Sequence, residues 1–306
     1  MNSPLQRRKF IKSLAALPAA AALSSLPRSA GSMPAVANAN PSRCGLKIGL
    51  NAFSFNDLLL GGKMTIDEVL DYCAEQCIDA VDLTGYYFPG YPAVPPDEYI
   101  YHVRKKAFRL GLEISGTGVR NNFTESDEGK RRADISLIKY WIEVAAKLGA
   151  PVIRVFAGEP STDQFDWDQV AKRMAGELKE CVGYGKAHGV VVAIQNHNDF
   201  IRTAAQVKKI MALVDSEWLG LHLDIGSYRE GDPYEEIRAS VSYAVNWQIK
   251  ENVYFNGKEV PTDFDRLTGI IRSSSYRGYL PLETLGPGNP KIKLAAMLEK
   301  LRNALN

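Results

Sequence analysis

Polar side chains that can transfer protons, bind cations or donate hydrogen bonds follow several short apolar segments of this chain. Residues 190–194 are all apolar and run directly into Gln195, Asn196 and His197. Other apolar segments lead in the same way to Asn51; to Arg154 and Glu159; to His222 and Asp224; to Asn246, Gln248 and Lys250; and to Glu283. Because buried polar groups need partners, this repetition favours one shared pocket that holds water or a ligand.

Three of these residues are candidates for proton chemistry. Glu283 is one candidate base, and His197 is another, because an unperturbed imidazole titrates near neutrality. Lys250 is the third. In a desolvated pocket the pKa of its ammonium group would fall and the amine would act as a base; a charged ammonium would instead act as an electrostatic clamp. Glu283, His197 and Lys250 are therefore the predicted catalytic residues.

The segments that must position these residues alternate regularly from residue 45 to the carboxyl terminus. Short apolar runs, often rich in β-branched residues, predict strands at 46–51, 80–83, 113–117, 152–156, 190–195, 220–225, 244–250 and 278–283. Amphipathic runs predict helices at 65–76, 97–110, 129–148, 167–188, 203–214, 233–242, 263–274 and 290–304. Eight strand–helix units predict a single-domain (β/α)8 TIM barrel over residues 45–306. An open doubly wound sheet is the alternative, but no G-x-G-x-x-G follows the first strand.

A barrel of this kind would bring the polar strand ends together. The carboxyl ends of its strands form the mouth where active sites lie, and strand residues two apart share a face. His222 with Asp224, and Gln248 with Lys250, would each share a face. The predicted substrate-binding residues at this mouth are Asn51, Arg154, Glu159, Asn196, His222 and Trp247.

Four strand ends resemble those of the xylose isomerase-like barrel family, which groups sugar phosphate isomerases and epimerases with relatives of endonuclease IV. The resemblance covers about residues 45–306. That family has an E-N-H-type motif at the fifth strand end, Asp at the sixth, an H-x-K-D-type motif at the seventh and Glu after "G-Y" at the eighth. Asp224 in "LHLDIGSY" and Glu283 in "GYLPLET" match directly, whereas Gln195 stands in place of Glu and Gln248 in place of His.

The resemblance implies a divalent metal site formed by Gln195, Asp224, Gln248 and Glu283. With the imidazole replaced by an amide, such a set would suit Mg²⁺, Mn²⁺ or Ca²⁺ better than zinc. Binding would be weak, because amide oxygens are neutral ligands. The alternative is that the metal is absent and that both glutamines hydrogen-bond sugar hydroxyls. Gln195 cannot take a proton from carbon, so a two-base epimerisation using both family Glu positions is in doubt.

The function implied by the resemblance is carbohydrate isomerisation or epimerisation. The reaction would begin with removal of a proton next to a carbonyl of a sugar or polyol, and a metal or Lys250 would stabilise the enediolate oxygen. A keto-sugar or keto-glycoside lyase or hydratase is the first alternative, since it shares that step and needs only one base. A non-catalytic sugar-binding barrel is an alternative of another class. A metal-clustered nuclease is disfavoured, because the chain has only four His.

Residues 1–39 predict a twin-arginine export signal and a periplasmic location. Arg7 and Arg8 precede an apolar run at residues 14–23, and A-x-A patterns follow at residues 35–39. The apolar run is shorter than the roughly 20 residues that a membrane helix needs, so no membrane association is expected after signal removal. The segment holds five of the 37 basic residues and none of the 35 acidic ones. The remainder is weakly acidic and shows no basic stripe for nucleic acid, and an oligomer is compatible with the sequence.

Overall fold

The computed structural model describes residues 45–159 and 166–306 of the chain. These residues belong to one compact unit, Asn40–Asn306. The predicted export signal at residues 1–39 lies outside the described residues. Among the helices of the described part, none is both long enough and apolar enough to cross a bilayer.

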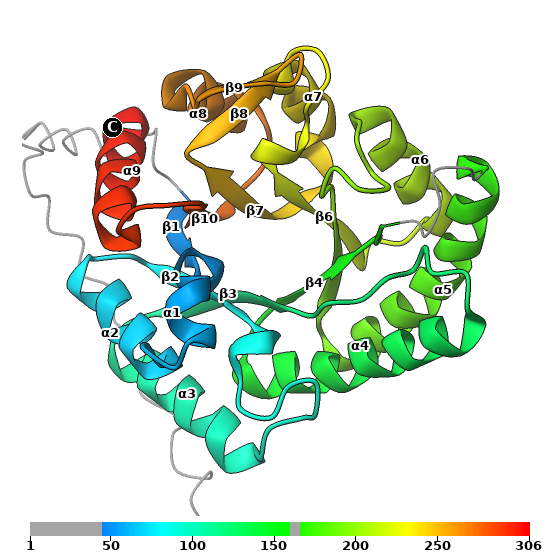
Figure 1. Ribbon diagram of the computed structural model, residues 1–306, viewed down its shortest axis with the longest axis horizontal. Coiled ribbons are helices and arrows are strands. Elements are labelled where there is room, and N and C mark those ends of the chain that lie inside the picture. Colours follow the sequence, from blue (N-terminus) through cyan, green and yellow to red (C-terminus); the bar gives the residue numbers. More distant parts are fainter. Residues whose placement is uncertain (1–44, 160–165) are drawn as a thin grey trace, which may run out of the picture. The chain divides into compact units, whose positions relative to one another are not determined.

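Eight parallel strands close into a barrel (Figure 1). They are β1 (Leu46–Asn51), β2 (Ala80–Thr84), β3 (Glu113–Gly118), β4 (Val152–Phe156), β5 (Val191–Gln195), β6 (Leu219–Asp224), β7 (Ala244–Lys250) and β10 (Gly278–Glu283). Their order around the ring is β1-β10-β7-β6-β5-β4-β3-β2, so β10 closes the barrel against β1. The register at this closure pairs Leu46 with Gly278. The predicted single (β/α)8 barrel is confirmed.

The helices surround the barrel (Figure 1). They are α1 (Asn56–Leu60), α2 (Ile66–Glu75), α3 (Asp97–Arg109), α4 (Glu128–Leu148), α5 (Trp167–His188), α6 (Ala204–Val214), α7 (Pro233–Ser240), α8 (Phe264–Ser273) and α9 (Pro290–Leu305). Capping boxes at Thr65 and Thr203 satisfy the first amides of α2 and α6. Gly149 and Gly189 end α4 and α5 with positive φ angles of 78° and 69°, which glycine adopts without a side-chain clash.

A two-stranded antiparallel hairpin, β8 (Asn252–Phe255) and β9 (Lys258–Pro261), follows β7 and was not expected from the alternation of strands and helices. Asn256 and Gly257 form its turn with φ angles of 47° and 78°, as a two-residue Asn-Gly hairpin turn requires. The amides of both turn residues donate to carbonyls of the loop that follows β6, at Gly231 and Arg229. These two hydrogen bonds hold the hairpin beside the carboxyl end of the barrel.

Candidate active site

A cavity of about 290 Å³ opens at the carboxyl ends of the barrel strands. Seven of the predicted site residues line it: Asn51, Arg154, Gln195, His197, Gln248, Lys250 and Glu283. They come from β1, β4, β5, β7, β10 and the segment after β5. The parallel strands thus gather into one pocket side chains that are separated by up to 232 positions along the chain.

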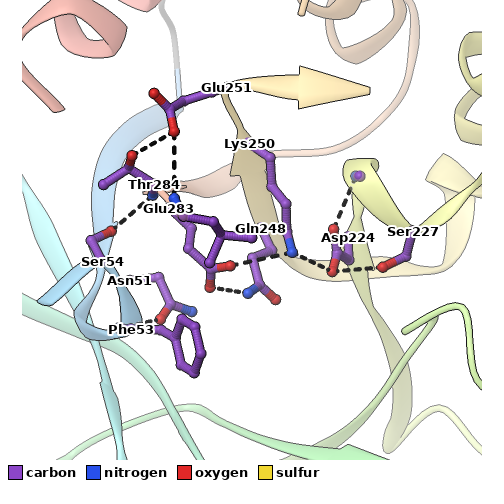
Figure 2. Close-up of polar contacts among 12 residues, drawn as sticks. Asn51, Phe53, Ser54, Asp224, Ser227, Gln248, Lys250, Glu251, Glu283 and Thr284 are labelled. Carbon is purple, nitrogen blue, oxygen red and sulfur yellow. Dashed lines mark hydrogen bonds and ion pairs between the residues drawn. The ribbon is translucent and has the colours of Figure 1, made fainter. Parts of the chain in front are cut away.

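Lys250 occupies the centre of this group, between two buried carboxylates (Figure 2). Its Nζ lies 3.0 Å from Oδ2 of Asp224 and 3.2 Å from Oε1 of Glu283. The side chains of Asp224 and Glu283 are 0% and 1% exposed. Three residues from three neighbouring strands of the ring therefore form one ion-paired cluster with little access to solvent.

Two glutamines extend this cluster by hydrogen bonds. Nε2 of Gln195 donates to Oδ2 of Asp224 at 3.0 Å and to Oε1 of Gln248 at 2.8 Å. Nε2 of Gln248 in turn donates to Oε2 of Glu283 (Figure 2). The structure therefore brings together the four residues that the family resemblance implies as a ligand set. The remaining amide oxygen, Oε1 of Gln195, is buried and has no hydrogen-bond partner among the described residues.

Asp224 is held in place from the loop that follows β6. Its Oδ1 accepts from the Gly226 amide at 3.0 Å, and its Oδ2 accepts from the Ser227 hydroxyl at 2.8 Å. Asn196 forms a reciprocal pair of 2.9 Å hydrogen bonds with the backbone amide and carbonyl of Asp224. Asn196 is fully buried and is absent from the described cavity lining, and its assignment as a sugar-binding residue stays a prediction. Its side chain joins the ends of β5 and β6.

The cluster sets the charges of its own members. Burial raises the pKa of Glu283, and the ammonium of Lys250 only partly opposes this effect. Burial acts in the same direction on Asp224, but Lys250 and hydrogen bonds bring the pKa of that carboxyl below its ordinary value. For Lys250, burial lowers the pKa, but the Asp224 and Glu283 carboxylates outweigh burial and raise it above its usual range. The prediction that Lys250 acts as a base through a lowered pKa is therefore wrong, and its ammonium stays charged.

The donor set at these positions does not fit a divalent cation. Both oxygens of Asp224, both oxygens of Glu283 and Oε1 of Gln248 already accept hydrogen bonds or the Lys250 ion pair. The only unpartnered ligand oxygen among the four described residues is Oε1 of Gln195. Among residues 45–159 and 166–306, no three His, Cys, Asp or Glu side chains are grouped as a metal site. A metal ion would have to displace the ammonium of Lys250.

Arg154 forms part of the cavity wall from β4. Its side chain is 3% exposed, its guanidinium lies 4.3 Å from the Phe156 ring centre, and its Nη1 has no hydrogen-bond partner within the described part. A Cβ atom on Gly118 would lie 2.7 Å from Nη2, so a side chain there would displace the guanidinium from this position. Arg154 is thus a buried donor that a ligand oxygen could satisfy.

Three other predicted substrate contacts lie away from the cavity. His222 is fully buried and is absent from the described lining; burial first, and then the Arg154 charge, lower its pKa to about 3, so its ring is neutral. Trp247 is buried on the face of β7 opposite to its neighbours in the chain, and its ring centre lies 5.7 Å from that of Tyr276. Glu159 is exposed and its side chain is not part of the described lining. None of these three side chains is part of the described cavity lining, and their roles in substrate contact stay predictions.

His197 lies on the cavity wall, just beyond the end of β5. Its side chain is 48% exposed, and Nδ1 lies 3.5 Å from Oδ2 of Asp199. Its ring packs edge-on against Phe156 at 4.8 Å. His197 therefore faces the same cavity as Glu283, three strand positions away around the ring.

Several lining residues were missed by the sequence analysis. They are Ser227 and Arg229 from the loop after β6, and Asn252, Tyr254 and Glu259 from the hairpin. Arg229 lies over the Tyr254 ring at 4.6 Å, which joins the two segments at the mouth. The Asn256-Gly257 pair between two apolar-containing runs was the sequence signal for this hairpin.

Asp82 on β2 is a further missed residue, and it lies inside the barrel. It is 1% exposed, and its Oδ2 accepts from Nδ2 of Asn246 at 3.0 Å while its Oδ1 has no partner in the described chain. Burial raises its pKa to about 6; the nearby Arg154 opposes the shift and Glu283 adds to it. A single Asp within a short apolar run gave little sign of this position.

The pKa of Asp82 predicts how stability depends on pH. Between about pH 4 and pH 6 the folded protein holds this proton and the unfolded chain loses it, so the free energy of unfolding falls as pH rises through this window. Above pH 6 the folded state carries the full penalty, about 3 kcal/mol at 1.36 kcal/mol per pKa unit. Asp82→Asn should therefore be more stable than the wild type at pH 7.5 and about equal at pH 4. Urea unfolding at both pH values tests this, and lower stability of the variant at pH 7.5 would contradict it.

Comparison with known proteins agrees with this architecture. The sequence profile of the family described as "Xylose isomerase-like TIM barrel" matches residues 70–304. A search of curated proteins finds no match. Many solved structures are similar, and at identities below 20% they share the fold.

Three of these structures illustrate the similarity. Apo 3-keto-D-glucoside 4-epimerase YcjR from E. coli has a TM-score of 0.68 and 18% identity over 84% of this chain and 99% of its own. D-Psicose 3-epimerase from Clostridium cellulolyticum H10, solved with D-tagatose, has a TM-score of 0.70 and 16% identity over 85% and 99%. The IolI protein with a bound zinc atom has a TM-score of 0.69 and 15% identity over 84% and 96%.

Proposed function

The chain belongs to the xylose isomerase-like TIM barrel family, and from this premise we propose that it is an enzyme that removes a proton next to a carbonyl group of a carbohydrate. Sugar epimerases and isomerases are among the structures that share its fold. The observation that carries the proposal is the position of Glu283. This buried carboxylate lines the cavity beside a fixed ammonium group, which supplies a base and a positive charge at one point.

Glu283 is the proposed base. Its pKa is raised by burial, which brings a carboxylate closer to the basicity that proton abstraction near neutral pH requires. Asp224 is less suited, because its lowered pKa and its hydrogen bonds to Gly226 and Ser227 hold it as a carboxylate. Asp224 instead positions Lys250.

Lys250 is the proposed electrophile. When Glu283 takes the proton from carbon, the electron pair moves to the neighbouring carbonyl oxygen and an enediolate forms. An ammonium 3.2 Å from the base lies close to this developing negative charge and stabilises it in a largely water-excluded site. This role is the one predicted from the sequence for a charged Lys250, that of an electrostatic clamp.

The fate of the enediolate depends on the number of bases. Isomerisation returns the proton to the adjacent carbon from the same carboxyl, while the hydroxyl proton moves from one oxygen of the enediolate to the other. Elimination expels a group from the next carbon, and this group leaves with the proton that Glu283 has taken. In both reactions Glu283 is the only base that acts on carbon. Epimerisation needs an acid on the opposite face, where Gln195 cannot serve. His197, which lines the cavity three strand positions from Glu283, would have to supply it. We therefore favour isomerisation, with elimination from a keto-sugar as the second candidate.

The cavity offers contacts for a small carbohydrate. Phe53, Tyr86 and Tyr254 line its mouth, and aromatic rings pack on the apolar faces of sugars. Oε1 of Gln195 and Nη1 of Arg154 are buried groups without partners among the described residues, and sugar oxygens would satisfy both. The substrate is proposed to be unphosphorylated, since the twin-arginine pattern at residues 1–39 supports a periplasmic location.

Proton exchange with solvent tests the proposal. The purified protein is incubated in D2O with unphosphorylated ketoses and with 3-keto-glycosides, and both substrate and products are followed by NMR. We expect an aldose or ketose product, or deuterium next to the carbonyl; loss of water or of an aglycone would identify the lyase alternative. Saturable binding of a sugar with neither deuterium exchange nor product would overturn the proposal that the protein is an enzyme. It would favour the alternative of a non-catalytic sugar-binding barrel.

A further inference from the structure

We propose that the ammonium of Lys250 permanently replaces the divalent cation that the resemblance implies for this site, and that the protein works without a metal. The binding part of this inference stands on geometry alone, whereas the catalytic role of the ammonium rests on the proposed function. Its central observation is that Nζ of Lys250 bridges Asp224 Oδ2 at 3.0 Å and Glu283 Oε1 at 3.2 Å (Figure 2).

The two glutamines complete this replacement. In a metal site all four side chains would direct oxygen lone pairs at one ion. Here the amide nitrogens of Gln195 and Gln248 donate to the two carboxylates instead, and Oε1 of Gln248 accepts from Gln195 at 2.8 Å. Glutamine can serve as both donor and acceptor in such a network, which glutamate cannot do when ionised.

The charge of the cluster is also consistent with one resident monovalent cation. The family's usual residues at these four positions, two Glu, one Asp and a neutral His, carry three negative charges, whereas the implied set in this chain carries two, because Gln195 and Gln248 are neutral. In this chain Asp224 and Glu283 carry two negative charges, and the Lys250 ammonium reduces them to one.

The surrounding backbone leaves space for the lysine stem. A Cβ atom on Gly226 would lie 2.7 Å from Cδ of Lys250, so any larger residue would push the stem aside. The amide of the same glycine donates to Oδ1 of Asp224 at 3.0 Å. The carbonyl of Lys250 accepts from the Thr262 hydroxyl at 2.8 Å. The lysine is thus positioned from its backbone to its Cδ atom.

Direct metal binding tests the inference independently of activity. Metal content is measured on the purified protein, and Mn²⁺ binding is titrated by calorimetry and by electron paramagnetic resonance. For the wild type we expect no stoichiometric metal, no saturable Mn²⁺ binding and a Tm unchanged by chelator, Mg²⁺, Mn²⁺ or Ca²⁺. Stoichiometric metal, or a Tm that falls with chelator, would overturn the inference without any variant.

Removing the ammonium of Lys250 should create affinity for a divalent metal ion. Lys250→Ala frees two buried carboxylates, so this variant should bind about one Mn²⁺ and should gain Tm when Mn²⁺ is added. Lys293→Ala is the matched control, because the one carboxylate that Lys293 pairs with in the described chain is Glu251, at 2.9 Å, and its Nζ otherwise donates to the Leu285 carbonyl; this variant should gain no binding. If Lys250→Ala does not fold, the measurements on the wild type decide.

The two proposals can fail separately. A wild-type protein that is free of metal yet converts no carbohydrate would overturn the proposed function and leave the ammonium replacement supported. A protein that converts a sugar only after Mn²⁺ is added would support the function and overturn the replacement.

Discussion

Glu283→Gln is expected to lower kcat for proton removal by about 10²- to 10⁴-fold, the range that a positioned general base contributes. The amide keeps the shape of the side chain but cannot accept a proton from carbon. Its carbonyl oxygen can still accept from Lys250, whose Nζ lies 3.2 Å from the native Oε1. Kinetics and solvent deuterium incorporation on the same substrate measure the effect, and circular dichroism shows that the barrel remains folded.

Glu259→Gln is the matched control for this substitution. Glu259 lines the same cavity from the hairpin, where its Oε1 accepts from Asn252 at 2.6 Å, but it has no contact with the Lys250 cluster in the described structure. We expect kcat within about tenfold of the wild type, well below the loss from removing a general base. If Glu283→Gln stays in that same range, Glu283 is not the base.

Lys250→Met is expected to lower the free energy of unfolding at pH 7 by about 3–5 kcal/mol, as breaking one side of a buried ion pair does. Methionine has a similar length but no charge, so Asp224 and Glu283 would remain buried beside each other without a counter-ion. Nearly all of the Lys250 surface is removed from water, with 15% of its side chain exposed. Urea unfolding in the presence of chelator measures the change, because added Mn²⁺ would restore part of the stability.

An exposed lysine provides the comparison. Lys209 pairs with Asp168 at 2.5 Å, but the two side chains are 46% and 55% exposed, so Lys209→Met should cost less than about 1 kcal/mol. A Lys250→Met protein that unfolds within 1 kcal/mol of the wild type would show that the ammonium does not hold the two carboxylates together. The Lys250→Met variant should also lose catalytic activity, as the Glu283→Gln variant does.

The predicted strands and helices agree with the structure closely, because each barrel strand is a short apolar run and each helix carries a regular amphipathic pattern. Even the ends of β1, β4 and β7 agree with the predicted bounds. The hairpin β8–β9 was missed, since its two four-residue strands do not follow the alternation of apolar and amphipathic segments. Its Asn256-Gly257 turn was the available local signal.

Strand periodicity by itself predicted that Gln248 and Lys250 share a face, and both line the cavity. The same periodicity places Trp247 on the opposite face, where it is buried; its prediction as a substrate contact did not follow this rule. For His222 the rule gave the correct face but not the depth. Two residues along a strand correspond to roughly 7 Å, so a side chain on the inward face can lie below the cavity, as His222 does.

The amino-acid sequence alone determined the barrel and the polar side chains at the ends of β1, β4, β5, β7 and β10 that line its mouth, because both follow from local periodicity and from where each strand ends. Only the tertiary structure decided the ionisation of these side chains. The pKa of Lys250 depends on the balance between loss of water and attraction to Asp224 and Glu283, which are distant in sequence. Desolvation alone would have lowered it, and distances of about 3 Å to two carboxylates reverse the sign.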